Sequence, residues 1–135
     1  MIVGTGCDLV PVARLREACE RHPSILDRVY VPAERARADA ARGDLRWERL
    51  AGVFAAKEAA LKALGTGMRV AFRDVEVGHD AAGRPLLLLH GAAAEVAGRL
   101  GARRLHLSIS HSGGLAMATV VAEGPCPDLP PGDVP

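Results

Sequence analysis

The strongest constraint on the fold is a long helical pattern in the middle of the chain, from about Leu45 to Leu64. At roughly 100° per residue, the larger apolar side chains form one stripe, and glycine and alanine form a second face. Because both faces suit close packing, we expect a central helix and not a surface one. The stripe contains Leu50, Val53, Phe54, Leu61 and Leu64, and the small-residue face contains Gly52, Ala55, Ala59 and Ala63.

The second half of this helical pattern carries three charged residues. Lys57 falls inside the apolar stripe, where an unpaired ammonium costs on the order of several kcal/mol, so it must either meet an anion or open onto a pocket. Glu58 lies at the edge of the stripe, and Lys62 follows it at i+4. The turn Gly65-Thr66-Gly67 comes next and lets backbone N–H groups approach an anion. This combination suits a phosphate, with or without a metal; the alternative is a solvated ion pair beside a lysine that extends to water.

The N-terminal residues alternate as a strand from Met1 to about Leu9, with Gly4, Gly6 and Asp8 on one face. The two glycines lack the third glycine of a dinucleotide-binding motif, which excludes that site. Asp8 shortly precedes Pro11, a favoured first residue of a helix, so its carboxylate could cap that helix. A carboxylate at the end of a strand that faces glycines is equally an open position for a metal ion.

The remaining pattern predicts one α+β domain over residues 1–123. From Gly124 onward, five prolines in twelve residues predict a disordered tail, residues 124–135. There is no internal repeat and no second domain. We expect helices at residues 11–21, 32–42 and 92–100, a short turn from Ser24, one hairpin from strands 74–78 and 85–90, and a second hairpin over 105–122.

Two further polar features have a structural and a functional interpretation. Ser108-Ile109-Ser110-His111 presents two hydroxyls on the face away from the core and a histidine at a turn, which alone indicates an exposed strand end. No G-x-S-x-G motif marks a nucleophile, and the histidine spacing matches no zinc motif. Arg14, Arg16 and Arg21 lie on the outer side of the first helix. They form either a solvated face or a docking surface for an acidic partner.

Composition excludes several classes of function. The net charge of +1 and the 3% of aromatic residues argue against a nucleic-acid partner. The three cysteines are odd in number and widely spaced, which favours a reducing compartment over a disulfide framework. The N-terminus lacks the pattern of a signal peptide and no apolar run is long enough to span a membrane. We therefore expect a cytoplasmic protein without a membrane partner.

Three segments together resemble the holo-acyl-carrier-protein synthase family, the short single-domain 4′-phosphopantetheinyl transferases. They are Gly6-Cys7-Asp8, the Phe54–Lys62 stretch with its Gly65-Thr66-Gly67 turn, and Ser108-Ile109-Ser110-His111. The resemblance runs in order from Met1 to about Glu123. It implies the 4′-phosphopantetheinyl transferase fold, an α+β fold in which a small antiparallel sheet wraps around a long central helix.

The resemblance also implies an activity. Members transfer the phosphopantetheine arm of coenzyme A to a serine of apo acyl carrier protein and release adenosine 3′,5′-bisphosphate, in fatty acid or polyketide biosynthesis. Asp8 and Glu58 match the magnesium ligands, and with Lys62 they are the expected catalytic residues. Magnesium favours hard oxygen ligands, so two carboxylates suit it. The proton of the acceptor serine would pass to Glu58 or to a metal-bound water that Glu58 orients.

Binding roles follow from the same resemblance. Family members of this length are homotrimers with coenzyme A bound across the subunit interface, and Arg14 matches the surface where the acidic carrier protein docks. Many relatives have an arginine where this chain has Val53, so the protein would either do without that arginine or recruit Arg46, Arg49 or Arg69. The expected coenzyme A contacts are Lys57, Lys62, Gly65, Ser110 and His111.

Two other functions remain open from the sequence. A non-catalytic module of the same fold could bind coenzyme A or a carrier protein without transfer. A metal-dependent phosphohydrolase would release phosphate without an acceptor protein.

Overall fold

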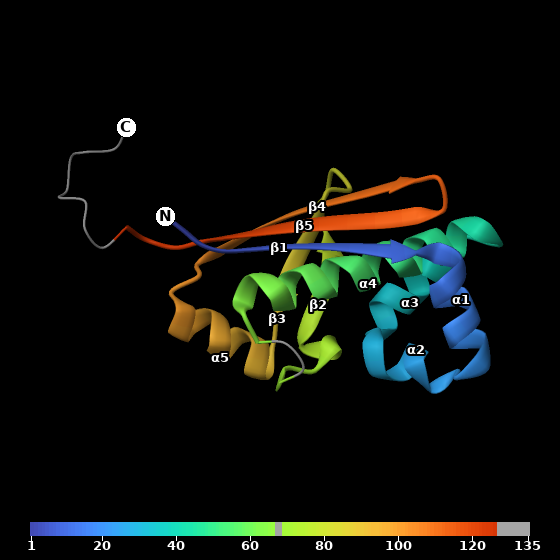
Figure 1. Ribbon diagram of the computed structural model, residues 1–135, viewed down its shortest axis with the longest axis horizontal. Helices are drawn as coiled ribbons and strands as arrows, with labels where there is room; N and C mark the ends of the chain where they lie inside the picture. The colour runs from blue at the N-terminus through green and yellow to red at the C-terminus, as the bar shows by residue number, and fades with distance from the viewer. Residues whose placement is uncertain (67–68, 127–135) are drawn as a thin grey trace.

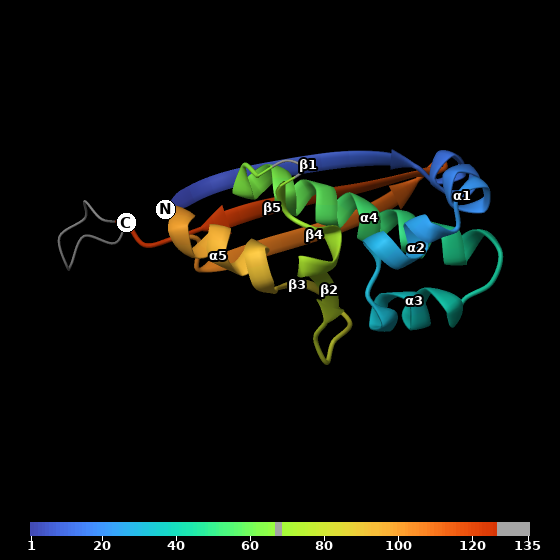
Figure 2. The ribbon, with the colours of Figure 1, turned by 90° about the horizontal axis from the view of Figure 1, so that it is seen from below.

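The computed structural model describes residues 1–66 and 69–126. Helix α4 (Asp44–Leu64) runs through the middle of the molecule, along a three-stranded antiparallel sheet (Figures 1 and 2). The sheet has the order β1-β5-β4, so the N-terminal strand pairs with the last one. Its strands are β1 (Ile2–Pro11), β4 (Arg104–Ser112) and β5 (Leu115–Glu123).

The other elements surround α4 on its remaining sides. The helices α1 to α3 gather at one end of the molecule, and α5 lies at the other end (Figure 1). The short 3-10 helix η2 (Phe72–Asp74) leads into a hairpin that covers the side of α4 away from the large sheet (Figure 2). These elements are α1 (Val12–Arg21), α2 (Ser24–Val29), α3 (Pro32–Asp39), β2 (Val75–His79), β3 (Pro85–Leu89) and α5 (Gly91–Leu100).

Glycines allow β1 to lie directly on α4. A Cβ atom at Gly4 would stand 2.0 Å from the carbonyl oxygen of Ala63, and one at Gly6 would stand 1.8 Å from that of Ala59. Both distances are far below any van der Waals contact, so only glycine fits at either position. The small-residue face predicted for the central helix therefore packs against the strand that carries the alternating glycines.

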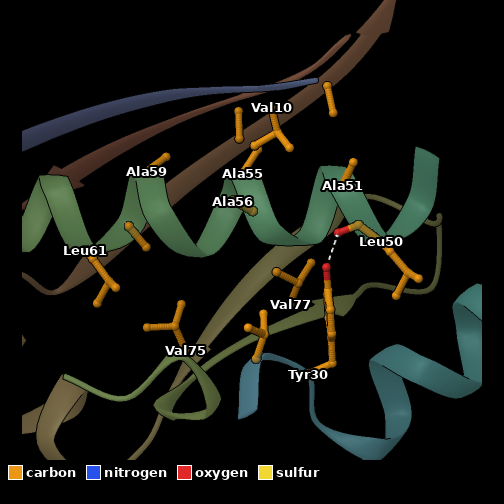
Figure 3. Close-up of a cluster of buried hydrophobic side chains, with 14 of the residues drawn as sticks. Val10, Tyr30, Leu50, Ala51, Ala55, Ala56, Ala59, Leu61, Val75 and Val77 are labelled. Atoms are coloured by element: carbon orange, nitrogen blue, oxygen red, sulfur yellow. Dashed lines mark hydrogen bonds between the residues drawn. The ribbon is translucent and has the colours of Figure 1, made fainter. Parts of the chain in front are cut away.

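The opposite face of α4 packs on the hairpin and on the α2–α3 segment. Figure 3 shows Val75 and Val77 of β2 below the helix and Tyr30 beside them. The buried hydroxyl of Tyr30 donates a hydrogen bond to the carbonyl oxygen of Leu50 at 2.8 Å. This bond satisfies the phenol within an otherwise apolar core. The expectation of a central helix buried on both sides is thus confirmed.

The predicted elements and the α+β class are confirmed, with differences at the ends. The turn expected from Ser24 is the helix α2, and Pro11 ends β1 instead of starting α1. The antiparallel strands form two sheets, not one. Gly124 is buried and exchanges backbone hydrogen bonds with Met1 in both directions, so disorder does not begin at residue 124. Residues 127–135 of the predicted tail lie outside the described residues.

In the part of the chain that the structure describes, none of the helices combines the length and the apolarity needed to cross a membrane.

Candidate active site

The close packing of β1 on α4 brings three of the predicted site residues together. Asp8 shares the face of β1 that carries Gly4 and Gly6, so its carboxylate points to α4. The ammonium Nζ of Lys62 lies 3.0 Å from Oδ1 of Asp8 and donates to the carbonyl oxygen of Cys7 at 2.9 Å. The capping role considered for Asp8 is wrong, because no side chain caps α1. We call Asp8, Glu58 and Lys62 the carboxylate site.

The electrostatics of the carboxylate site place a second carboxylate next to the first. Partial burial raises the pKa of Glu58, the negative charge of Asp8 raises it further, and Lys62 opposes the shift. The hydrogen bond to Asp8 raises the pKa of Lys62. Glu58 is therefore a carboxylate whose ionised form the surroundings disfavour, which is a common feature of functional acids and bases.

The donor set of this site fits a magnesium ion. Two carboxylates that repel each other gain from a divalent cation, and Mg²⁺ often takes only one or two carboxylates and completes its shell with substrate phosphates and water. Within residues 1–66 and 69–126, no group of three or more acidic, histidine or cysteine side chains is arranged to hold a metal. Asp8 of β1 and Glu58 of α4 would be its protein ligands.

An open groove of about 950 Å³ leads away from Glu58 and Lys62. Its walls are largely apolar, and they include the rings of Phe54 and Phe72, which stack on each other with their centroids 5.6 Å apart. Gly65, at the end of α4, also lines it. The other lining residues are Ile25, Asp27, Arg28, Val29, Leu61, Val70, Ala71 and Arg73.

Lys57 does not join the carboxylate site. Its side chain has no exposed surface, and Nζ lies 2.7 Å from Oε1 of the equally buried Glu34. It also donates to the carbonyl oxygens of Val29 at 2.6 Å and Phe72 at 3.2 Å. The sequence left two possibilities for Lys57, an anionic partner or an opening onto a pocket. The structure shows the anionic partner, which is Glu34 of the same chain. The expected contact of Lys57 with coenzyme A finds no support in this geometry, because the ammonium is enclosed.

Glu34 is a residue that sequence reasoning missed. Oε1 accepts a hydrogen bond from the backbone N–H of Val31, and Oε2 accepts one from that of Val77, both at 2.8 Å. The first bond is the local signal: a glutamate at the third position of a helix that starts at Pro32 reaches back to the residue before the helix. Nothing in the sequence indicates the bond to Val77, because β2 lies far along the chain.

Ser110 and His111 lie apart from the carboxylate site within one chain. The Nε2 atom of His111 donates to the carbonyl oxygen of Glu48, ten residues before Glu58 and so about 15 Å away along α4. His111 lines a separate pocket of about 200 Å³ on this part of α4. Ser110 lies on the exposed outer face of the large sheet. The pocket is also lined by Arg37, Arg49, Val53 and His79.

Arg14 lies on the exposed outer side of α1. Its neighbours Arg16 and Arg21 pair with Glu20 and Glu17 on the same helix. The structure of the described residues gives Arg14 no such ion pair. It is therefore the arginine of this helix that is most available to an acidic partner.

Comparison with known proteins identifies what this arrangement is similar to. The model of the 4′-phosphopantetheinyl transferase superfamily matches residues 4–120. A holo-acyl-carrier-protein synthase of Koribacter versatilis is 48% identical over 130 residues, which cover 91% of this chain and 99% of that protein. One of Solidesulfovibrio magneticus is 50% identical over 127 residues, covering 92% and 100%.

Solved structures give the same result. The holo-acyl-carrier-protein synthase of Plasmodium yoelii superposes with a TM-score of 0.81 at 31% identity, covering 93% of this chain and 98% of that one. The Helicobacter pylori protein, solved in complex with coenzyme A, has a TM-score of 0.76 at 30% identity, covering 88% and 99%.

Proposed function

Because the chain belongs to the 4′-phosphopantetheinyl transferase superfamily, we propose that the carboxylate site is where it transfers phosphopantetheine from coenzyme A. The protein is a holo-acyl-carrier-protein synthase, as its similarity to curated enzymes over most of both chains indicates. Its acceptor is a serine of apo acyl carrier protein. The resemblance recognised in the sequence is thus confirmed at the level of family and reaction.

One observation carries the assignment of the site. Asp8 and Lys62 come from different elements and meet at 3.0 Å, next to a Glu58 whose pKa the surroundings raise. Phosphoryl transfer requires alignment and charge neutralisation more than covalent chemistry. A basic side chain, two carboxylates that suit a cation and an adjoining groove supply these requirements.

The reaction exchanges one P–O bond for another. The serine oxygen bonds to the phosphorus that carries the pantetheine, the bond from this phosphorus to the bridging oxygen breaks, and adenosine 3′,5′-bisphosphate leaves. Glu58 takes the serine proton, directly or through a water that it orients. Lys62 neutralises charge on the departing phosphate. Magnesium held by Asp8 and Glu58 would stabilise negative charge on the pyrophosphate oxygens.

The groove beside Glu58 suits the pantetheine arm. The arm is a flexible chain with apolar stretches, and the walls around Phe54 and Phe72 are largely apolar. Lys62 and Gly65 stand where the arm would join the pyrophosphate. The adenosine end would then leave the groove on the side of Lys62.

We assign the adenosine end to a second copy of the chain. His111 contacts Glu48, ten residues before Glu58, and Ser110 lies on the sheet face that points away from α4, which supports a coenzyme site completed by a neighbour. In the pocket of that neighbour, Arg49 and Arg37 stand beside Val53 and could replace the arginine that many relatives have there. Of the three arginines considered from sequence, Arg49 is the one that lines this pocket.

The outer face of the large sheet supports assembly into the homotrimer that the resemblance implies. Leu9, Leu115 and Met117 expose 56%, 38% and 39% of their surface there. A row of exposed apolar side chains on one sheet face is typical of an interface between subunits. A cytoplasmic location and a role in fatty acid biosynthesis complete the proposal.

Arg14 is our candidate contact for the acidic carrier protein. Reversing its charge in Arg14→Glu should raise the KM for carrier protein several-fold and leave the KM for coenzyme A unchanged, because surface charges mainly affect encounter with a charged partner. Arg99→Glu on α5 is the matched control. An unchanged carrier KM in Arg14→Glu would refute this docking surface.

Intact-mass spectrometry tests the function. Apo acyl carrier protein is incubated with this protein, coenzyme A and magnesium, with a parallel reaction in EDTA. We expect the carrier to gain one phosphopantetheine only with magnesium. If several carriers gain nothing while coenzyme A binds, the protein is a binding module, and release of phosphate without a carrier would indicate a phosphohydrolase.

A further inference from the structure

Lys57 and Glu34 form the most enclosed polar contact in the described part of the molecule. The exposed fractions of their side chains are 0% and 1%. Between them they accept or donate bonds to the backbone at Val29, Val31, Phe72 and Val77, in addition to their own contact. The pair therefore connects α4 with the end of α2, the start of α3, η2 and β2.

Two of these hydrogen bonds go to residues that line the groove. Val29 and Phe72 both line it, and Lys57 binds the carbonyl oxygen of each. Phe72 also stacks on Phe54, one helical turn before Lys57 on α4. Lys57 thus fixes two residues that line the groove to α4, which also lines it through Phe54, Glu58 and Lys62.

The residue after Lys57 is Glu58. Successive residues of a helix point about 100° apart, so Lys57 turns into the protein while Glu58 reaches the carboxylate site. Any shift of the walls relative to Lys57 is therefore a shift relative to Glu58. The placement of the groove and the placement of the carboxylate are coupled through two adjacent residues.

Stability alone does not account for such a pair. Replacing both members of a buried ion pair by apolar residues of similar volume is often neutral or stabilising. What apolar residues cannot provide is the directional bonding to four separate backbone groups that sets the spacing of the elements.

We propose that Lys57 and Glu34 are positioning residues that hold the walls of the groove at the separation required by the pantetheine arm, in register with Glu58. This inference rests on the proposed function. Lys57 is too enclosed to touch the substrate, and Glu34 acts on the groove through its contact with Lys57.

The test separates the arm from the adenosine end of the coenzyme. The double variant Lys57→Met/Glu34→Gln removes both charges, and glutamine keeps the volume of Glu34, which also lines the pocket of His111. Calorimetry measures the affinity of the folded protein for coenzyme A and, separately, for adenosine 3′,5′-bisphosphate, which lacks the arm. The control is Arg46→Met/Asp39→Leu, which removes an ion pair that does not line the groove.

We expect the double variant to bind coenzyme A about tenfold more weakly and adenosine 3′,5′-bisphosphate within about twofold of the parent, since small misplacements can cost large factors. The control should change neither affinity. Equal loss for both ligands, or loss for neither, would overturn the proposal, because a purely structural role does not distinguish them.

A second variant covers the case in which the double variant does not fold. Lys57→Arg keeps the charge but adds bulk next to Val29 and Phe72, so it should also weaken coenzyme A selectively. Unchanged binding of both ligands in Lys57→Arg would then contradict the proposal. Failure of the proposed function is a separate result, since the unmodified protein would then neither bind coenzyme A nor modify a carrier.

Discussion

Two neighbouring charged residues of one helix have opposite environments. Lys57 is completely enclosed by Glu34 and backbone carbonyls, whereas Glu58 stands at the edge of an open groove. Removing either member of the buried pair alone would leave an unpaired charge inside the protein, at a cost of about 3–5 kcal/mol. The ion pair of Lys62 with Asp8 is half exposed and contributes at most about 1 kcal/mol. The charges that suit chemistry are thus not those that the fold encloses.

Glu58 should lower the stability of the native protein at neutral pH. Its native pKa is raised by burial and by Asp8, so between its unfolded and native pKa values the native state binds more protons, and stability falls as the pH rises. The melting temperature of Glu58→Gln minus that of the parent should therefore increase as the pH rises from about 4 to about 7. Thermal unfolding at several pH values measures this. A difference in melting temperature that does not change with pH would contradict it.

At the scale of elements, the contact of β1 with α4 positions the carboxylate site. Alternating glycines bring the strand onto the helix backbone, and Asp8 follows in the same alternation. An added Cβ at Gly6 would meet the carbonyl oxygen of Ala59, which cannot yield without moving the helix or the strand. The same feature therefore determines both the packing and the reach of Asp8 to Lys62.

We predict that Gly6→Ala lowers the free energy of unfolding by about 3 kcal/mol or more, as for other overpacked core sites. The matched control is Gly98→Ala in α5, where an added Cβ meets nothing within 4 Å. It should stabilise by about 0.5–1 kcal/mol, because alanine is the better helix former. Denaturant unfolding measures both. A Gly6→Ala variant as stable as the parent would refute the close contact.

Much of this arrangement could be predicted from the sequence, and the reasons are local. Periodicity and turn residues predicted the central helix, both hairpins and the face of β1 that carries Gly4, Gly6 and Asp8. The buried partner of Lys57 could not be predicted, because Glu34 and Val77 meet only in the folded chain. The same applies to Gly124, which pairs with Met1 at the other end of the sequence. Local patterns specify elements and faces, but not which distant groups meet.

At the scale of the whole molecule, the residues expected to bind magnesium or coenzyme A fall into two groups, apart from the enclosed Lys57. Asp8, Glu58 and Lys62 lie together, while His111 lies on the earlier part of α4. Leu9 and Ser110 both flank Met117 in adjacent strands. The exposed outer face of the sheet therefore carries Ser110, one of the expected coenzyme A contacts, beside the apolar residues. A coenzyme A site shared between two copies would take the first group from one copy and His111 from the other.

Charges on that outer face should separate the subunits. We predict that Leu9→Lys/Met117→Lys turns a homotrimer into a monomer and reduces transfer at least tenfold, because burying two ammonium groups at each interface is costly. Light scattering coupled to size exclusion measures the mass. The control is Leu88→Lys, an exposed leucine on β3. A parent protein that is monomeric and fully active would contradict the shared site.

The central claim is that Asp8 and Glu58 act in phosphopantetheine transfer. The most direct measurement is the intact-mass assay run on Asp8→Asn, on Glu58→Gln and on Asp27→Asn, an exposed carboxylate that also lines the groove. We predict that the first two lose transfer by more than about 100-fold while they remain folded, as expected when transition-state charge stabilisation is removed, and that Asp27→Asn keeps it. Transfer at the parent rate by both Asp8→Asn and Glu58→Gln would contradict the account.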